Sequence, residues 1–500
     1  MRVVLEQIEY QNPENNNKNN NKNNNKINNI KQQMTSTSTS SNGDGSNMPV
    51  WVDDSHMDTE WLLAKTKIHC RAPSQNLVAV AKDISTNQGR IGSVPREGGT
   101  VLLSLINKSD EDDDNDTDDR HEDATAVGEL VLKQIVVGPT ADLSLQLGLS
   151  REAFFYRDLA PRLDVRNGSN ASLLTKIYYA HGDTTTGEKC IIMESLSHWI
   201  DSGVFFGPNE GTGFRSNPNN WSPRNLPALI SEAYGSEDGT HRHIPTPRAV
   251  AQQTFRSVAQ IHASFWQDES LLDDSKQWLR GHAWLRGSGK ESWEASQSLI
   301  RTIWEQYNHL ERNESDDSPK DIRWDPVVRM AVDKCIRGIS WQAQLDRLHV
   351  DGRWTLVHGD FWPGNIMWDP TNDDGNFRIL DWEMVGLGSG PQDLGQYVLS
   401  NMDPADRRTC ERELVQAYYD ELVLCGVPTS NQSENDTHSD LWEYCWKEYC
   451  VGGVERWLWF LTWFLGQPAL REWTQFFHDQ ISAFMKDHNL TAADLTQPRP

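Results

Sequence analysis

The sequence has little cysteine and no long hydrophobic run. Its seven cysteines are scattered over 500 residues, and Cys445 and Cys450 have no companion pair at zinc-binding spacing. This pattern excludes a disulfide-stapled secreted scaffold and a cysteine metal cluster, and it is typical of reduced thiols. The opening MRVVLEQIEYQ lacks the apolar stretch of a secretory signal and the pattern of a transit peptide. We therefore expect a cytoplasmic protein with no membrane span.

Basic residues are also scarce relative to acidic ones. Lys and Arg number 47 against 72 Asp and Glu, which gives a net charge of −25. Such a balance argues against a nucleic-acid partner, because nucleic acids require a basic surface. Between residues 108 and 123 ten acidic residues meet only two basic ones, and we interpret 108–126 as a solvated acidic loop. The Asn-rich and Ser-rich stretch 1–50 predicts a disordered tail. No feature of the sequence indicates a protein partner.

The most specific feature present is a polar motif in residues 356–381, LVHGDFWPGNIMWDPTNDDGNFRILD. His358, Asp360 and Asn365 reproduce the interval of the kinase catalytic loop H-R-D-x-x-x-x-N, with Gly359 in the place of Arg. A carboxylate at Asp360 can accept a proton from an attacking hydroxyl. Asn365 and Asp381 carry the oxygen ligands that hold Mg²⁺ against phosphate groups. The motif therefore predicts phosphoryl transfer from a metal-bound nucleotide.

The predicted strands around this motif support the same interpretation. A β-prone run at 354–357 precedes it, and runs at 366–368 and 377–380 flank a turn at 373–375. The resulting hairpin carries the loop at one end and Asp381 at the other. Pro363-Gly364 bends the loop, so that Asp360 and Asn365 face the same point.

The motif has two alternative interpretations. Each of these residues taken alone is explained by ordinary turn chemistry, but their ordered combination argues against coincidence. A metallophosphoesterase also uses His, Asp and Asn with Gly-Asp dipeptides. It needs in addition a Gly-Asn-His-Asp/Glu element, and none follows Gly359-Asp360.

The segments HGDFWPGNIMW and ILDWEMVGLGSGPQDLGQYV resemble the aminoglycoside phosphotransferase and choline kinase group, which includes the insect ecdysteroid-kinase-like proteins. The resemblance implies an α+β, bilobal protein-kinase-like fold, with a small antiparallel-sheet N-lobe and a larger, mainly helical C-lobe. It implies that Asp360 is the catalytic base, that Asn365 and Asp381 are the metal ligands, and that ATP and Mg²⁺ are the cofactors. Asp393 matches a family aspartate that braces the catalytic loop.

Such a kinase needs a lysine on an upstream strand and a glutamate on the next helix. The run GELVLKQIVV, residues 128–137, reads as a strand and contains Lys133 as the expected phosphate-gripping lysine. The next helix opens at Ser150 as its N-cap, has Glu152 placed to pair with Lys133, and ends at Pro161. A strand lysine whose amino group only reaches solvent is the commoner case in general. The position of Lys133 upstream of Glu152 and Asp360 favours the functional role.

The resemblance also places the hinge between the lobes. Residues 174–180 and 189–193 predict a hairpin, after which Glu194 and Leu196 fall where backbone groups hold adenine. This gives an N-lobe at 51–196 and a C-lobe at 197–500. The Gly-, Asn- and Pro-rich stretch 197–245 is predicted to be an insert, and we expect it to act as a substrate lid because long loops of this kind tend to be functional.

The phosphate-covering loop departs from the kinase pattern. The segment QGRIGS, residues 88–93, lies between predicted strands at 77–81 and 100–106 and has two glycines where G-x-G-x-x-G has three. Gly92 and Ser93 are the candidates to offer backbone N–H groups to phosphate. An ordinary hairpin loop is an equal alternative.

An aromatic segment at 441–464 predicts helix but not its role. Its side chains either fill the core of the C-lobe or, as in choline-type kinases, cage a cationic substrate through Trp457, Trp459 or Trp463. Upstream, Thr246-Pro247 is predicted to begin a helix that reaches about Trp266.

The sequence thus predicts an ATP-dependent kinase acting on the hydroxyl of a small molecule, with choline, ecdysteroid or aminoglycoside-type acceptors. A protein kinase is disfavoured because Asp393 follows Asp381 too closely to leave room for an activation segment. The alternative is a catalytically weak or inactive nucleotide-binding scaffold.

Overall fold

The protein is described by a computed structural model at residues 47–53, 55–68, 77–83, 99–107, 126–167, 173–206, 225–234, 244–312, 322–349, 353–370, 376–429, 441–467 and 470–496. The chain divides into two compact units. One contains residues 1–153 and 176–195, and the other contains residues 154–175 and 196–500. Most of the predicted tail 1–50 and of the acidic loop 108–126 lies outside the described residues.

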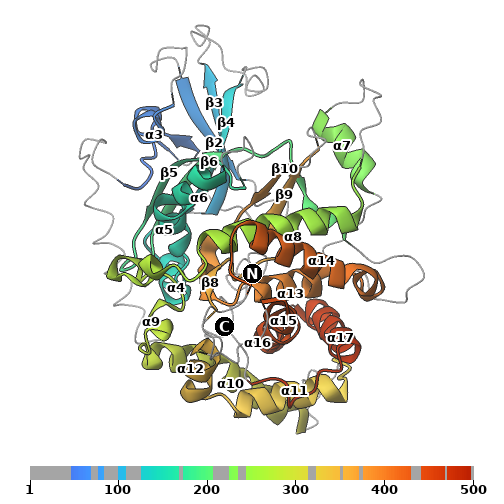
Figure 1. Cartoon of the computed structure of the whole chain (residues 1–500). Coiled ribbons are helices and arrows are strands. Elements are labelled where there is room, and N and C mark those ends of the chain that lie inside the picture. The colour runs from blue at the N-terminus through green and yellow to red at the C-terminus, as the bar shows by residue number, and fades with distance from the viewer. Residues whose placement is uncertain are drawn as a thin grey trace, which may run out of the picture. The chain divides into compact units, whose positions relative to one another are not determined.

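The first unit is built on one antiparallel sheet of six strands in the order β1-β2-β3-β4-β6-β5 (Figure 1). Its elements are β1 (His56–Met57), α3 (Thr59–Thr66), β2 (Leu77–Asp83), β3 (Gly99–Asn107), β4 (Ala126–Ile135), α4 (Pro139–Leu147), the first turn of α5 (Arg151–Asp158), β5 (Ile177–Gly182) and β6 (Lys189–Glu194). The predicted strands at 77–81, 100–106 and 128–137 and the predicted hairpin at 174–193 are confirmed.

One face of this sheet is buried under α3. The side chain of Asp58 accepts from the backbone N–H groups of Glu60 and Trp61 and so caps the helix. Trp61 and Leu62 then pack on a layer of buried strand residues that includes Leu103 and Leu132. Because side chains alternate along a strand, Lys133 lies on the opposite face from Leu132.

The helix predicted to end at Pro161 continues further along the chain. It is interrupted at Leu159, and α6 (Ala160–Asn167) then begins with Pro161 in its first turn. Proline is tolerated there because the first N–H groups of a helix have no intrahelical partner. The stretch 154–175, which the sequence assigned to the N-lobe, groups with the second unit. One tie is the N–H of Ile379, which donates to the carbonyl of Leu173 at 3.0 Å.

The second unit is mainly helical. Before the catalytic motif it contains α6, β7 (Ile200–Asp201), η6 (Ser202–Phe205), α7 (Leu226–Tyr234), α8 (Pro247–Ser264), η8 (Glu269–Leu272), η9 (Asp274–Lys276), α9 (His282–Leu285), α10 (Lys290–Arg312), α11 (Pro326–Arg337) and α12 (Trp341–His349). Helix α8 begins as predicted, because the Thr246 hydroxyl accepts from the N–H of Ala249 at 3.2 Å. Of the insert 197–245, the residues 207–224 and 235–243 lie outside the described residues.

Short strands carry the polar motif of residues 356–381. They are β8 (Thr355–Val357), β9 (Ile366–Asp369), β10 (Asn376–Ile379) and β11 (Gly386–Gly388), with the 3₁₀ turns η10 (Pro363–Asn365) and η11 (Trp382–Met384) between them. β9 pairs antiparallel with β10, and β8 pairs with β11. The predicted hairpin around the motif is confirmed.

The core of this unit surrounds α13 (Pro391–Asn401), whose residues are all buried. The remaining elements are α14 (Pro404–Leu424), α15 (Leu441–Lys447), the π-helical turn η12 (Glu448–Gly452), α16 (Gly453–Leu465) and α17 (Arg471–Asp487). Helix α13 packs against η12, α16 and α17, coloured orange to red in Figure 1. Two glycines set the α13–α16 distance: a Cβ on Gly395 would lie 2.6 Å from the Cα of Gly453.

The aromatic segment forms core. Trp457, Trp459 and Trp463 are all buried, and the ring of Trp457 lies 4.2 Å from that of Phe477. Within the part of the chain that the structure describes, no helix is long and apolar enough to cross a membrane.

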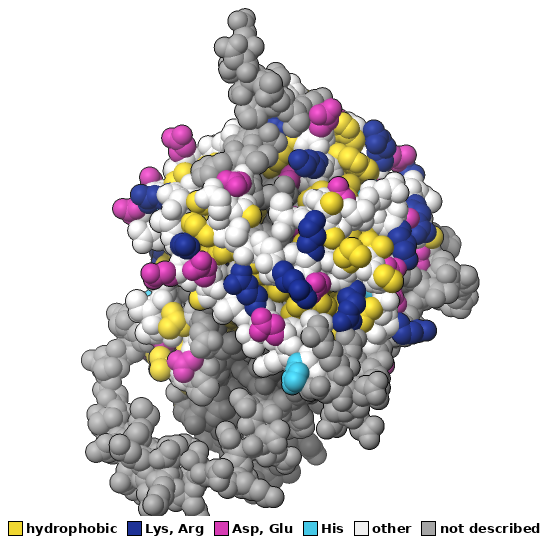
Figure 2. Space-filling view, turned by 90° about the horizontal axis from the view of Figure 1, so that it is seen from below, with side chains coloured by type: hydrophobic (Ala, Val, Ile, Leu, Met, Phe, Trp, Pro, Cys, Tyr) yellow, Lys and Arg dark blue, Asp and Glu magenta, His cyan; other side chains and the backbone are white. Residues whose placement is uncertain are grey.

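The surface carries mixed charge. On the face in Figure 2, Lys and Arg side chains gather in a band, with Asp and Glu side chains and hydrophobic groups among them. Together with the net charge of −25, this mixture is unlike the basic surface that binds a phosphate backbone.

The structure confirms the predicted α+β class, with an antiparallel sheet in the N-terminal part and a mainly helical C-terminal part.

The glycine contact gives a prediction for stability. In a free helix, Gly395→Ala would stabilise by about 1 kcal/mol through helix propensity. Here the new methyl group would lie 2.5 Å from the carbonyl oxygen of Tyr449, and a backbone atom cannot move aside as a side chain can. We expect a net loss of about 1–3 kcal/mol in the free energy of unfolding, measured by urea denaturation. Leu424→Ala, at an exposed position, is the control that should change little.

Candidate active site

The loop after β8 carries the predicted base. Asp360 is buried, and its two carboxylate oxygens accept different hydrogen bonds. Oδ2 accepts from Nδ2 of Asn365 and Oδ1 accepts from Nε2 of Gln396, each at 3.3 Å. These two bonds fix the orientation of the carboxylate.

The side-chain amide of Asn365 has a defined orientation. Its Nδ2 also donates to the backbone carbonyl of Asp360 at 2.9 Å. Both partners of the amide are acceptors only, so the NH₂ group must face Asp360 and Oδ1 must face the other way. The amide oxygen is therefore directed away from Asp360, as a metal ligand requires.

Asp381 is tied to the same loop through its neighbour Leu380. The N–H of Leu380 donates to the carbonyl of Asn365 at 2.8 Å. Its carbonyl accepts from Nε2 of His358, also at 2.8 Å. Asp381 itself adopts a left-handed conformation, with φ of 62°. Such a backbone is uncommon for a residue other than glycine and tends to occur at functional sites.

Trp382 fixes the turn that follows Asp381. Its ring is fully buried and stacks on Phe155 with 4.0 Å between ring centroids. Its Nε1 donates to the carbonyl of Ile379 at 3.2 Å. The first residue after the candidate metal ligand is thus anchored in the core.

Asp393 braces the loop from helix α13. Its carboxylate accepts from the backbone N–H of His358 at 2.7 Å and from that of Gly359 at 3.2 Å. Burial opposes ionisation, but His262, with Nε2 at 3.4 Å, and the contacts with His358 hold the pKa of Asp393 below its usual value. The predicted bracing role is confirmed, and the buried His262 is part of the brace.

Gly359 occupies a position that other residues cannot. Its φ is +76°, and a Cβ there would lie 2.4 Å from the carbonyl oxygen of Met384. The Arg of the protein-kinase loop is therefore excluded at this point of the chain. A buried arginine, Arg456, and a half-buried one, Arg280, approach this glycine instead. Arg456 Nη2 donates to the carbonyl of Gly359, and Arg280 Nε donates to that of Met384 at 3.3 Å.

Gln396, Arg280 and Arg456 were not among the predicted site residues. Gln396 lies three residues after Asp393, so both project from one side of α13, and this spacing was a usable signal. Nothing in the sequence pairs Arg280 or Arg456 with the catalytic loop, because both are distant from it along the chain.

The predicted lysine–glutamate pair is present in the first unit. Lys133 Nζ lies 2.8 Å from Oε2 of Glu152. A third member that was not predicted is Lys189, whose Nζ lies 2.9 Å from the same oxygen. Lys189 begins β6 on the same face of the sheet as Lys133 and is fully buried. One carboxylate is thus shared by two lysines.

The remaining predicted site residues fall into two groups. Gly92 and Ser93 lie outside the described residues. Glu194 ends β6, where its Oε1 accepts from the N–H of Lys176 at 2.7 Å. Leu196 is the first residue of the second unit after that strand, and its carbonyl accepts from the N–H of Trp199.

The residues of the loop and the hairpin fit a magnesium ion. Asn365 offers an amide oxygen and Asp381 a carboxylate, the hard oxygen ligands that Mg²⁺ prefers. Both are held by the backbone of Leu380. A metal held by one or two side chains, with phosphate oxygens as further ligands, is the usual arrangement in phosphoryl transfer.

Comparisons with known proteins give the following matches. A family model described as "Uncharacterized oxidoreductase dhs-27" matches residues 252–441. No curated protein matches. Among solved structures, the chain is similar to choline kinase from Cryptosporidium parvum (11% identity, 86% of this chain and 96% of that chain, TM-score 0.41). It is also similar to an ethanolamine kinase from Plasmodium vivax, with 12% identity, coverage of 83% of this chain and 82% of that chain, and a TM-score of 0.33. A choline/ethanolamine kinase family protein from Mesorhizobium loti matches with 11% identity, coverage of 74% of this chain and 87% of that chain, and a TM-score of 0.33.

Proposed function

We propose that this protein is a phosphotransferase that moves a phosphate group from ATP to the hydroxyl of a small molecule. The observation that supports this best is the buried loop in which Asp360 and Asn365 are bonded to each other and tied through Leu380 to Asp381. The set supplies a base and two oxygen ligands. Mg-ATP, when bound, supplies the phosphoryl group and a metal charge that offsets the phosphate charge.

In this proposal Asp360 orients the acceptor hydroxyl and takes its proton. Gln396 and Asn365 each hold one oxygen of its carboxylate, so the group keeps one orientation as the acceptor approaches. Positioning of this kind contributes much of the rate in phosphoryl transfer, because the transition state needs in-line geometry rather than covalent help from the protein.

Lys133 is the proposed phosphate contact in the first unit. Its ion pair with Glu152 is the arrangement that protein kinases use to hold this lysine. Lys189 remains bonded to Glu152 through the same oxygen, so the carboxylate stays compensated when Lys133 engages phosphate. By resemblance, backbone groups near Glu194 and Leu196 contact adenine, and those of Gly92 and Ser93 contact phosphate.

The acceptor is a small alcohol, for which choline, ethanolamine, ecdysteroid and aminoglycoside-type compounds are the candidates. Burial of Trp457, Trp459 and Trp463 gives no support to a cation–π cage built from them. A screen of γ-labelled ATP against a panel of these alcohols identifies the acceptor class.

An oxidoreductase, as in the description of the family model, fits the fold poorly. Nicotinamide and flavin dinucleotides bind folds built on a parallel sheet with a glycine fingerprint. Among the described strands every ladder is antiparallel. An inactive nucleotide-binding scaffold is the remaining alternative, and the presence of Asp360, Asn365 and Asp381 argues against it.

The first prediction concerns the base. Asp360→Asn preserves the size of the side chain and removes the proton acceptor, so we expect nearly all turnover to be lost. Mg-nucleotide binding, measured by calorimetry, should remain within about threefold of the wild type, because the metal ligands are intact. Full turnover in this variant contradicts the assignment of the base.

The second prediction concerns the metal. Asp381→Ala removes a carboxylate ligand, so we expect turnover to fall to near zero and Mg-nucleotide affinity to fall at the same time, by roughly tenfold or more. Titration with nucleotide in the presence of Mg²⁺ or of EDTA separates the two effects. Equal affinity of wild type and variant with Mg²⁺ rules out Asp381 as a ligand.

The third prediction separates the two lysines. Lys133→Met should weaken binding of Mg-ATP more than binding of adenosine, since only ATP carries phosphates. Lys189→Met leaves the Lys133–Glu152 pair in place. It should lower the thermal unfolding midpoint, measured by calorimetry, with a smaller effect on ATP affinity. The assignment is wrong if Lys133→Met leaves ATP affinity unchanged.

A further inference from the structure

Two arginines of the helical unit are fully buried, and their surroundings differ. Arg407 lies in the first turn of α14, and Arg456 lies in the first turn of α16. A buried guanidinium is costly unless carboxylates or hydrogen-bond acceptors surround it. Arg407 and Arg456 differ in how many of their guanidinium nitrogens have such partners.

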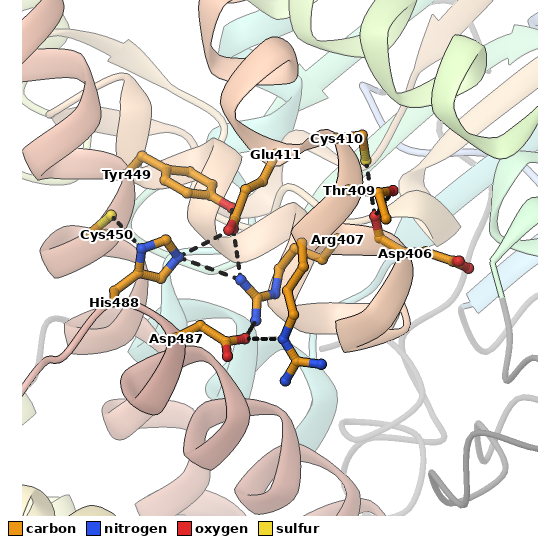
Figure 3. A network of polar contacts seen from close by, with 10 residues as sticks. Asp406, Arg407, Thr409, Cys410, Glu411, Tyr449, Cys450, Asp487 and His488 are labelled. Carbon is orange, nitrogen blue, oxygen red and sulfur yellow. Dashed lines mark hydrogen bonds and ion pairs between the residues drawn. The ribbon is translucent and has the colours of Figure 1, made fainter.

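Arg407 is fully compensated by its neighbours (Figure 3). Its Nη1 donates to Oε2 of Glu411 at 2.6 Å, and its Nη2 pairs with Asp487. Tyr449 and His488 bond to the same oxygen of Glu411. Burial by itself lowers the pKa of Arg407, but Tyr449, Glu411 and Asp487 together raise it above its usual value. This network joins α14, η12 and α17.

Among the described residues, Arg456 has a single hydrogen bond, from Nη2 to the carbonyl of Gly359. Its Nε and Nη1 are buried and have no hydrogen-bond partner among the described residues. Burial and the nearby Arg280 lower its pKa to about 9, while Asp360 and Asp393 oppose that shift. The Phe460 ring lies 4.8 Å from the guanidinium carbon, but two buried nitrogens without a hydrogen bond still need a reason to be retained.

The α13–α16 crossing explains why Arg456 reaches the loop. Gly395 and Gly453 let the two helix backbones touch. Gly395 lies between Asp393 and Gln396, and Arg456 lies one turn after Gly453. The crossing thus brings three side chains to the loop of residues 358–361. Asp393 accepts from the N–H groups of His358 and Gly359, and Gln396 accepts from the N–H of Phe361 at 3.3 Å. Arg456 donates to the carbonyl of Gly359.

The hydrogen bond from Arg456 to the carbonyl of Gly359 affects Asp360, because this carbonyl belongs to the peptide that joins Gly359 to Asp360. On the other side of that peptide, the N–H of Asp360 donates to Nδ1 of His358 at 3.3 Å. The peptide plane is therefore held from both sides. Without Arg456 the peptide plane keeps only the hydrogen bond on its His358 side, and the torsions of a glycine offer little resistance to a tilt of that plane. The Asp360 side chain, which follows this peptide, would then meet Asn365 and Gln396 in a less defined orientation.

We propose that Arg456 is a positioning residue, whose guanidinium holds the Gly359–Asp360 peptide and thereby aims the Asp360 carboxylate at the acceptor hydroxyl. This inference rests on the proposed kinase function for its catalytic meaning. The contact itself is independent of that function.

The test compares Arg456→Met with Arg456→Lys, and uses Arg407→Met as a matched control that removes an equally buried arginine outside the site. Two quantities are measured: kcat and KM for ATP and acceptor, and amide hydrogen exchange of residues 356–365. For Arg456→Met we expect kcat to fall roughly 100-fold with KM values within about threefold, the signature of a misaligned base. Exchange of the loop amides should become roughly tenfold faster, the factor of one lost hydrogen bond.

Arg456→Lys keeps the charge and one donor, so it should recover kcat to within about tenfold of the wild type. Arg407→Met should lower the unfolding midpoint and leave kcat of the folded protein and the loop exchange within about twofold. Should Arg456→Met fail to fold, Arg456→Gln, which keeps one donor, replaces it in the same comparison.

Wild-type loop exchange and kcat in Arg456→Met would overturn the proposal. So would equal loosening of the loop in Arg407→Met, since the effect would then be global. In a different outcome, the wild type transfers no phosphate to any alcohol while Arg456→Met still speeds up exchange of the loop amides. That result overturns the kinase assignment but supports the contact between Arg456 and the loop.

Discussion

The carboxylate of Asp393 is the constraint on which the helical unit depends. It is fully buried and accepts from two consecutive backbone N–H groups of the catalytic loop. A buried charge is stable only where its acceptor capacity is filled. Asp393 meets that condition because the loop turns its N–H groups toward α13. The loop conformation and the ionised state of the brace therefore stabilise each other.

The geometry of the loop follows from that bond and from the glycines around it. Gly359 takes a backbone conformation that brings two N–H groups to one carboxylate, and Gly395 and Gly453 bring α16 close enough for Arg456 to reach the opposite side. Small residues at these points leave room for polar contacts. Larger ones would move the backbone by distances that a positioned base cannot tolerate.

Function is read from this site rather than from the fold, since one architecture supports many reactions. A fixed carboxylate, an amide whose oxygen is oriented by its own hydrogen bonds, and a second carboxylate on a strained residue match the needs of phosphoryl transfer. The first unit contributes a lysine whose glutamate is shared with Lys189. That second lysine keeps Glu152 compensated whatever Lys133 contacts.

Features that depend on the order of neighbouring residues could be predicted from the sequence alone. The spacing of His358, Asp360 and Asn365, the hairpin that follows, the strand with Lys133 and the Thr246 cap are all set by neighbouring residues, so they were predictable. The end of the helix near Pro161 was not, because proline is compatible both with stopping a helix and with starting the next one. Tertiary structure alone decided that Lys189 joins Glu152, that the tryptophans of α16 fill the core, and that Arg456 meets Gly359. These contacts join segments far apart along the chain, and they arise from helix and strand packing that no local pattern encodes.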